Sequence, residues 1–277
     1  MTLPPDRVSR AFWDKQWATE SIPRPVDPED GSVRNTLRRA FHSYFSRYLA
    51  RMRGKPDIDL LEVGCARSIW LPYFAREFGF RVTGVDYSET GCQKSREILA
   101  AQHVSGTVLH QDIFLPPADM IERFDVVVSF GLVEHFEDTA GVIRALAAFL
   151  KPGGVMITNI PNVRGTIGFV QRLFNRPVYD QHVPHTDASL SAAHEAAGLQ
   201  VQDCGYFLST GYNTLNFQHP DRDGTVHPVA AAVKLSLVSL SVAVWFLEKH
   251  VGRLPVSRSF SPYVNCIAIK PAKAAAS

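Results

Sequence analysis

Between residues 57 and 160 the chain alternates short apolar runs with longer stretches in which apolar residues recur at helical spacing. Short apolar runs bounded by turn residues are typical of buried strands, and stretches of about a dozen residues with a period near 3.6 are typical of amphipathic helices. The predicted strands are 59–63, 81–88, 106–113, 124–130 and 153–161, and the predicted helices are 70–79, 90–102 and 139–150. This alternation predicts βαβ units, and therefore an α/β fold with a doubly wound, mostly parallel sheet.

The hydrophobic pattern changes on both sides of this stretch. Residues 1–53 lack strand character, but apolar residues within 33–52 recur at spacings of three and four, which predicts a helical leader or lid ahead of a domain at 54–277. After Pro161 the regular pattern is lost, and residues 161–187 predict a loop. The remaining predicted elements are a helix at 188–197, strands at 199–208 and 263–271, and a helical insertion at about 220–256 before the last strand.

The insertion is unusually apolar. Residues 229–247 carry one charge, Lys234, and otherwise consist of Ala, Val, Leu, Ser, Trp and Phe. Their number reaches the lower end of the membrane-spanning range, which begins at about 17 residues. A span is disfavoured because it would interrupt the sheet between its last two strands with no second span to return. Three interpretations stay open: a buried helix, a homodimer interface, and an interfacial helix on a bilayer. The first two rank ahead of the third, in which these residues would meet headgroups: Lys249, His250, Arg253 and Arg258.

Composition and charge narrow the functional classes. The 277 residues are 45% hydrophobic, which is ample for a globular core, and the formal net charge is +2 without a long Lys or Arg run. Nucleic acid is therefore not an expected partner. The cysteines lack CxxC spacing and are interpreted as buried thiols in a reducing compartment: Cys65, Cys92, Cys204 and Cys266. The amino-terminal stretch lacks the apolar core of a signal peptide, so the chain is expected in the cytoplasm, either free or peripheral to the membrane.

The loop after the first predicted strand has an altered glycine pattern. A dinucleotide-binding loop has three glycines, and here only Gly64 is kept, with Ala66 and Ser68 at the other two positions. Side chains there obstruct the approach of a pyrophosphate to backbone N–H groups. Asp86 ends the second predicted strand, 22 positions beyond Gly64, where an acid accepts hydrogen bonds from ribose hydroxyls. Asp86 therefore indicates adenosine, while the loop argues against a dinucleotide.

The charge of Glu62 also argues against a dinucleotide. Glu62 stands two residues before Gly64, where a carboxylate would repel a pyrophosphate and attract a cationic ligand. S-adenosylmethionine has a ribose, a sulfonium and an ammonium group but no phosphate. The residues therefore predict S-adenosylmethionine as the cofactor.

Five segments resemble, in order and spacing, the motifs of class I S-adenosylmethionine-dependent methyltransferases. They are "LLEVGCARS", "VTGVDYS", "LHQDI", "FDVVVSFGLVEHF" and "LKPGG", and the resemblance is close over residues 57–160. It implies a Rossmann-like methyltransferase fold and small-molecule methylation. The segment "GCARS" departs from the usual GxGxG pattern, so the path of the loop is expected to differ.

The resemblance also assigns roles to single residues. It implies that Glu62 and Gly64 flank the methionine end of the cofactor, with Ala66 in the same loop. Asp86 would hold the ribose hydroxyls, and Phe130 and Gly131 would pass under the sulfonium. The adenine side is assigned to Tyr87, Ser88, Asp112 and Ile113, with Asp112 taking the exocyclic amine.

Two aromatic residues of the leader, Trp13 and Trp17, stand four apart and so share one helix face. The resemblance suggests that they close over the cofactor, with Trp17 among the cofactor-binding residues. The alternative is an aromatic staple onto the core. His135 follows the fourth predicted strand and is the candidate general base, because a neutral imidazole accepts a hydroxyl proton. An alternative of equal weight is that Glu134 and His135 only begin a helix there.

Acceptor-binding candidates lie at the end of the fifth predicted strand and beyond it. The candidates are Asn159, Asn162, Tyr179, His182, His185 and Tyr206, with Tyr212, Asn213 and His219 as a further wall. Tyr179, Asp180, His182 and His185 also raise the question of a metal, but no second matched pair of ligands is present, so no metal is predicted.

Taken together, these residues predict an S-adenosylmethionine-dependent methyltransferase acting on a small, lipid-linked or carrier-linked metabolite through an oxygen or nitrogen acceptor. Two alternatives come from other classes. A non-catalytic scaffold of the same fold is suggested by Ala66 and Ser68, and an NAD-dependent oxidoreductase shares the adenosine argument but conflicts with Glu62.

Overall fold

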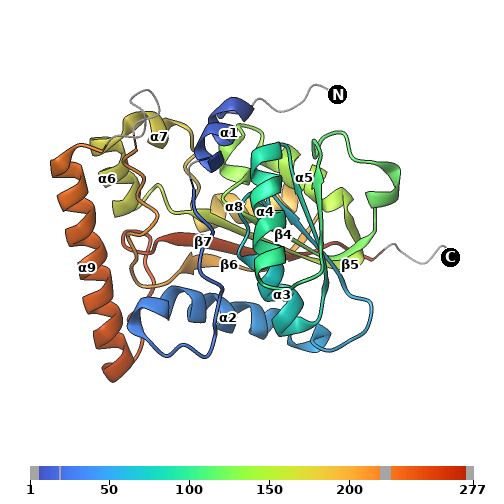
Figure 1. Cartoon of the computed structure of the whole chain (residues 1–277), viewed down its shortest axis with the longest axis horizontal. Helices are drawn as coiled ribbons and strands as arrows, with labels where there is room; N and C mark the ends of the chain where they lie inside the picture. The colour runs from blue at the N-terminus through green and yellow to red at the C-terminus, as the bar shows by residue number, and fades with distance from the viewer. Residues whose placement is uncertain (1–5, 19, 219–225, 273–277) are drawn as a thin grey trace.

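The computed structural model describes residues 6–18, 20–218 and 226–272. It has a seven-stranded sheet in the order β3-β2-β1-β4-β5-β7-β6, with helices on both faces (Figure 1). The strands are β1 Asp59–Val63, β2 Arg81–Asp86, β3 Thr107–His110, β4 Phe124–Phe130, β5 Leu150–Pro161, β6 Gln200–Phe207 and β7 Tyr263–Ile269. The α-helices are α1 Arg10–Ala18, α2 Thr36–Leu49, α3 Trp70–Phe78, α4 Glu89–Ala101, α5 Thr139–Ala148, α6 Thr166–Phe174, α7 Arg176–Asp180, α8 Asp187–Ala196 and α9 Pro228–Val251.

The strand order determines where ligands bind. β1 pairs in parallel with both β2 and β4, so the chain winds outward from this point in both directions. In open α/β sheets, the ligand crevice lies outside the carboxyl ends of the strands at this switch point. β7 is inserted between β5 and β6 and is antiparallel to both. The predicted doubly wound, mostly parallel sheet is confirmed.

The sheet separates two hydrophobic cores. On one face α2, α3 and α4 pack against the strands, and the α2 residues Phe45 and Leu49 are completely buried there. On the other face α5 and α8 cover the sheet through residues such as Ile143 and Leu190. The apolar residues of 33–52 that recur at spacings of three and four therefore form the face of helix α2 that packs against the sheet. The division of the chain at residues 53 and 54 stays a prediction.

Residues 161–187 correct one expectation. We expected a loop, but the segment contains helices α6 and α7. The physical reason is a helical period hidden among polar residues. Ile167, Val170, Gln171 and Phe174 recur at spacings of three, one and three, which places them on one face of α6, and Ile167 and Gln171 are buried. Asn, Arg and Gly residues around them obscured that pattern.

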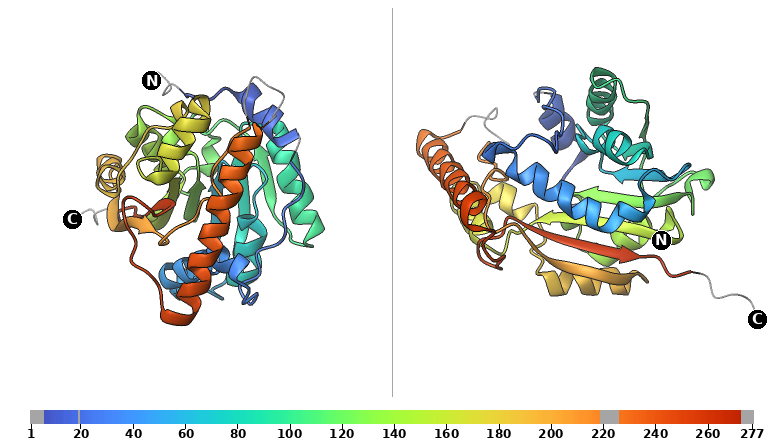
Figure 2. Two further views of the ribbon diagram at one scale, coloured as in Figure 1. Left: turned by 90° about the vertical axis from the view of Figure 1, so that its left-hand side faces the viewer. Right: turned by 90° about the horizontal axis from the view of Figure 1, so that it is seen from below.

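Of the two interpretations ranked first for helix α9, the structure contradicts the buried helix, while the homodimer interface stays a prediction. The helix stands at the edge of the molecule (Figures 1 and 2), and it is long and apolar enough to cross a membrane by length and composition alone. Its inner face is held by Trp245, whose Nε1 donates to the Thr210 carbonyl at 3.0 Å, and by Ala230 packed against α6. Its outer face is exposed.

Candidate active site

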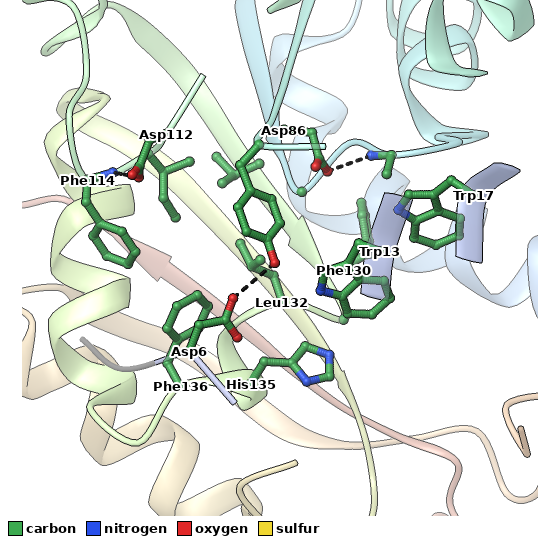
Figure 3. A pocket seen from close by; sticks show the side chains of 16 residues that line it. Asp6, Trp13, Trp17, Asp86, Asp112, Phe114, Phe130, Leu132, His135 and Phe136 are labelled. Carbon is green, nitrogen blue, oxygen red and sulfur yellow. Dashed lines mark hydrogen bonds between the residues drawn. The ribbon is translucent and has the colours of Figure 1, made fainter. Parts of the chain in front are cut away.

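A cavity of about 310 Å³ lies at the carboxyl ends of β1, β2, β3 and β4, beneath helix α1 (Figure 3). Its walls come from the loop after each of these strands and from the amino-terminal segment. The lining residues are Asp6, Trp13, Trp17, Val63, Gly64, Ala66, Asp86, Tyr87, Asp112, Ile113, Phe114, Phe130, Gly131, Leu132, His135 and Phe136.

The loop after β1 uses its own N–H groups for internal bonds. Gly64 turns the chain with φ +75°, a value that favours glycine, and its N–H and that of Cys65 donate to the Val85 carbonyl at 2.9 and 3.2 Å. The Ala66 N–H donates to Asp86 Oδ2 at 3.0 Å, and the Ser68 N–H donates to Ser95 Oγ at 3.0 Å. These groups are therefore committed to the protein and do not form a cradle for a pyrophosphate.

The start of α3 is closed in the same way. Ser68 Oγ accepts the N–H groups of Trp70 and Leu71, each at 3.0 Å, and donates to Glu62 Oε2 at 2.6 Å. Helix amino termini bind phosphate through such free N–H groups. Since these two are capped by Ser68, the site is unsuited to a dinucleotide. It fits a nucleoside without phosphate, which is what S-adenosylmethionine presents.

Asp86 lines the cavity at the carboxyl end of β2. One carboxylate oxygen accepts from Ala66 and the other accepts the Ser88 N–H at 2.8 Å. Each oxygen keeps a second lone pair, so the group can still accept two ribose hydroxyls. Burial raises the pKa of Asp86 to about 6, although the hydrogen bonds from the Ser88 and Ala66 backbone oppose that rise. Asp86 is therefore mostly charged at neutral pH.

The far end of the cavity fits a flat, weakly polar ring. Asp112 Oδ1 accepts the Phe114 N–H at 2.9 Å, which orients the carboxylate (Figure 3), and Ile113 lines the cavity next to it in the chain. Tyr87 crosses the opening, and its hydroxyl donates to Asp6 Oδ2 at 3.0 Å. Apolar walls with one oriented acceptor match an adenine and its exocyclic amine.

Helix α1 closes the cavity from above. Trp13 and Trp17 stack with their ring centroids 5.5 Å apart, and both line the cavity. This close approach depends on Gly91 in α4, because a Cβ there would lie 2.5 Å from the Ala66 Cβ and 3.0 Å from Trp17. The missing side chain lets α1, α4 and the loop after β1 meet.

A second cavity of about 470 Å³ adjoins the first and shares Trp13, Trp17, Phe130, Gly131 and His135 with it. Its other walls are mainly apolar and aromatic. They are Phe12, Gln16, Leu37, Phe41, Ile69, Trp70, Glu134, Asn159, Pro161, Val163, Ile167, Gln171, Val178, Gln181, His182, Thr214, Asn216 and Tyr263.

His135 stands at the junction of the two cavities. It belongs to the short 3-10 helix η4, Val133–His135, and its ring meets Trp13 edge-on at 5.4 Å. Its Nδ1 lies 2.9 Å from the carbonyl oxygen of Gln181, which can only accept, so Nδ1 carries the proton. Nε2 of the neutral ring then keeps a free lone pair. Burial lowers the pKa of His135, so the ring is neutral at physiological pH.

Two more titratable groups face His135. Glu134, His135 and His182 each offer a ligand atom within 4.8 Å of the others. Burial raises the pKa of Glu134 to about 8, and within the described residues neither carboxyl oxygen has a hydrogen-bond partner. Burial, with His135 close by, lowers the pKa of His182 to about 4. All three side chains are therefore uncharged near pH 7.

Comparison with known proteins identifies the family. The family model described as a methyltransferase domain matches residues 34–203, well over half of the chain. The chain belongs to this methyltransferase family. S-adenosylmethionine is its cofactor, and methyl transfer is its reaction.

Two relatives carry the name of an O-methyltransferase, and one solved structure shares the fold. The chain is 28% identical over 206 residues to a ubiquinone biosynthesis O-methyltransferase of Methylobacterium nodulans, a match that covers 72% of this chain and 80% of the relative. It is 32% identical over 162 residues to a protein of the same name from Paramagnetospirillum magneticum, covering 56% of this chain and 62% of that protein. The solved structure of the [4+2]-cyclase SpnF is similar in fold, with a TM-score of 0.60, 16% identity and 98% of each chain covered.

Most of the cofactor residues expected from the sequence of this methyltransferase line the first cavity, and two do not. Glu62 lies below the loop after β1, where its buried carboxyl group accepts from Ser68, so the expectation that it flanks the cofactor directly needs correction. Burial also raises the pKa of Glu62 to about 8. Ser88 caps α4 by accepting the Gly91 N–H at 3.0 Å and donates to Asp14, so its assignment to the adenine side is corrected as well.

Some of the predicted acceptor-binding residues line the second cavity and others do not. Asn159 and His182 line the second cavity. Asn162 instead holds the carbonyls of Arg258 and Ser261, and His185 is bonded to Thr139 and Ser189. Outside both cavities lie Tyr179, Tyr206, Tyr212 and Asn213, while His219 falls outside the described residues.

Several lining residues of the methyltransferase were missed from the sequence. Asp6 and Phe136 meet where the amino-terminal segment forms an isolated bridge to η4. Gln171 and Asn216 come from α6 and from the segment before α9, and the Gln171 side chain bonds both backbone groups of Asn216. Only the helical period of α6 could have indicated Gln171, and no local signal marks the others.

Proposed function

We propose that this methyltransferase methylates a hydroxyl oxygen on an acceptor with a flat, largely apolar body, linked to a lipid or carrier. One observation carries the proposal: a second, mostly apolar cavity meets the cofactor cavity at a neutral imidazole with a free Nε2. A hydroxyl must lose a proton during methylation, whereas an amine or thiol is already nucleophilic. A base placed at the junction therefore favours an oxygen acceptor.

The residues divide the work between positioning and proton transfer. When bound, S-adenosylmethionine supplies an electrophilic methyl group. Phe130 and Gly131 line both cavities where they meet, so the methyl donor and the acceptor oxygen are brought together there. His135 Nε2 accepts the hydroxyl proton, and the Gln181 carbonyl stabilises the imidazolium that forms by keeping its bond to Nδ1. Trp13 covers the junction and limits the entry of water.

The walls of the second cavity support the acceptor class. Phe41, Trp70, Phe130 and Tyr263 present aromatic faces, while Asn159 and Thr214 offer scattered polar groups. Such walls suit an aromatic ring with an apolar substituent. The relatives named ubiquinone biosynthesis O-methyltransferases point in the same direction, to oxygen methylation of a metabolite. The free thiols of Cys65, Cys92, Cys204 and Cys266 support action in the reducing cytoplasm.

A panel of model acceptors tests this proposal. Purified enzyme is incubated with methyl-labelled S-adenosylmethionine and catechols that carry alkyl chains of increasing length, alongside anilines and thiophenols with the same chains. We expect methyl transfer to the catechols, with kcat/KM rising with chain length as more apolar surface is buried. Faster methylation of the matched amines or thiols would contradict an oxygen acceptor, and a fall with chain length would contradict an apolar one.

A further inference from the structure

The outer face of α9 is a largely apolar surface that also carries the exposed hydroxyl groups of Ser236 and Ser239. It is formed by exposed apolar residues that share one face of the helix: Val229, Ala232, Leu235, Leu240, Ala243, Phe246 and Leu247. We call these residues the α9 stripe. It contains no charged side chain. Exposed apolar patches of this extent on soluble proteins mark sites of interaction with a partner or a membrane.

The single charge in the middle of α9 does not interrupt the stripe. Lys234 is half-buried, burial lowers its pKa, and the opposite charge of Glu20 acts on it from the protein side. Its ammonium therefore lies off the outer face. Leu254, Val256 and Phe260, which follow the helix, are exposed as well and add to the apolar surface.

Basic residues gather where α9 ends. Within residues 247–262, Lys249, Arg253 and Arg258 carry three positive charges, and Glu248, whose Oε1 accepts the Leu254 N–H at 3.0 Å, carries the one negative charge. Lys249 Nζ also donates to the Gly31 carbonyl at 3.1 Å, next to the exposed acids Glu29 and Asp30. Arg34 is exposed in the 3-10 helix η1, Val33–Asn35, which contacts α9. An apolar stripe with a basic end is the pattern of helices that lie in the interface of anionic membranes.

We propose that the α9 stripe docks this protein on the surface of a bilayer containing anionic lipids. A second copy of the chain fits the surface less well. A 24-residue helix is about 36 Å long and about 10 Å wide, so one face offers roughly 360 Å². A stable protein interface buries about 800 Å² on each partner. A bilayer sets no such requirement and complements the basic end.

The position of α9 connects this surface to the second cavity. Its inner face packs through Ala230, Leu237 and Val238 against a cluster that includes Ile167 of α6. Ile167 also lines the second cavity, and α6 lies beside α9 in both views (Figures 1 and 2). Docking through α9 therefore brings the acceptor cavity close to the bilayer. This link to acceptor delivery rests on the proposed function, whereas the docking surface stands on its own observations.

The test measures binding to vesicles without any acceptor. The full chain is sedimented with vesicles of phosphatidylcholine, with and without phosphatidylglycerol, at low and high salt. We expect binding that needs phosphatidylglycerol and weakens with salt. The triple variant Leu235→Ser, Leu240→Ser, Phe246→Ser should bind the mixed vesicles at least about tenfold more weakly, because three side chains that enter the interface are lost. Arg253→Glu should remove much of the salt dependence.

A matched control has the same chemistry on other surfaces. Ile22→Ser, Leu115→Ser and Ile121→Ser also replace exposed apolar residues, and this variant should bind vesicles as the wild type does. Leu235 and Leu115 are comparable, at 69% and 66% exposed. Cofactor affinity and circular dichroism establish that both variants fold. His135→Ala should dock normally, so failure of the oxygen-acceptor proposal leaves the docking result intact.

Three results would overturn the docking proposal. They are no binding of the wild type to either kind of vesicle, equal binding by the α9 triple variant, and a concentration-dependent dimer in ultracentrifugation that the triple variant abolishes while vesicles are not bound. The last result would assign the stripe to a second copy.

Discussion

The two cavities of this methyltransferase differ in how their polar groups are used. Around the cofactor cavity, the loop N–H groups, Asp86 and Asp112 already have protein partners. Around the acceptor cavity, Glu134 and Thr214 have buried side-chain oxygens that lack partners within the described residues. Buried polar groups without partners are costly, and they are kept mostly where a ligand completes them. We therefore expect the cofactor site to be pre-formed and the acceptor site to be completed by its substrate.

The largest effect is expected for His135, the proposed general base where the two cavities meet. His135→Ala should lower single-turnover methyl transfer by about a hundredfold to ten-thousandfold, the usual contribution of a general base. The wild-type rate should fall at low pH, as the imidazole becomes protonated through its lowered pKa, and this inflection should vanish in the variant. Cofactor affinity should hardly change.

His182→Ala is the matched control for that experiment, because His182 is a buried imidazole in the same cavity. We expect a higher KM with the low-pH inflection retained. If the His135 variant kept the wild-type profile and plateau, proton acceptance by His135 would be excluded.

A smaller effect is expected for Asp86 in the cofactor cavity. Asp86→Asn should weaken cofactor binding by about 1–3 kcal/mol, because charged hydrogen bonds to the ribose are lost. In the wild type the charged carboxylate is the binding form, so affinity should rise as pH increases through about 6, the raised pKa of Asp86, and level off above it. At pH 5 the loss should be about tenfold.

Calorimetric titration from pH 5 to 8 measures both effects of Asp86. The pH dependence should disappear in Asp86→Asn. It should persist in Asp112→Asn, the control at the other end of the cavity. A flat wild-type profile would mean that Asp86 does not face the ribose.

The smallest effect should come from Glu134. Its pKa of about 8 makes it neutral at pH 7, as glutamine is, so Glu134→Gln should retain the wild-type rate within about twofold there. Above pH 8 only the wild type acquires a negative charge beside His135, and the two rate profiles should separate. A large loss already at pH 6 would show that Glu134 works as a carboxylate.

Adding a chelator tests whether the Glu134 carboxylate helps to bind a metal ion. We expect no change of rate on chelation. Loss of activity that a divalent cation restores would instead place an ion among Glu134, His135 and His182, whose ligand atoms lie within 4.8 Å of one another.

The same contrast explains what could be predicted from the sequence. The predicted cofactor residues Gly64, Asp86, Asp112 and Gly131 lie at the end of a strand or just after it and line the first cavity, because parallel strands bring their carboxyl ends to one edge. A local pattern therefore determined a three-dimensional position. Glu62 and Ser88 show the limit of that argument, because their motif positions are right while their side chains serve the loop and a helix cap.

The acceptor cavity could not be predicted in this way. Its walls come from α1, α2, α3, β4, η4, β5, α6, α7, β7 and the segment before α9, and long-range packing decides which of their side chains meet. His135 was found because it follows β4, whereas its neutral tautomer depends on the Gln181 carbonyl, 46 positions away. For α9, composition indicated an apolar helix, but only packing determines which face is left outside.

Trp13 and Trp17 belong to the walls of both cavities, so we expect the binding of the two ligands to be thermodynamically linked. A ligand that contacts the indole pair would hold α1 in the position that the other ligand also needs. Cofactor and acceptor should therefore bind with positive cooperativity, and the factor by which each tightens the other must be the same.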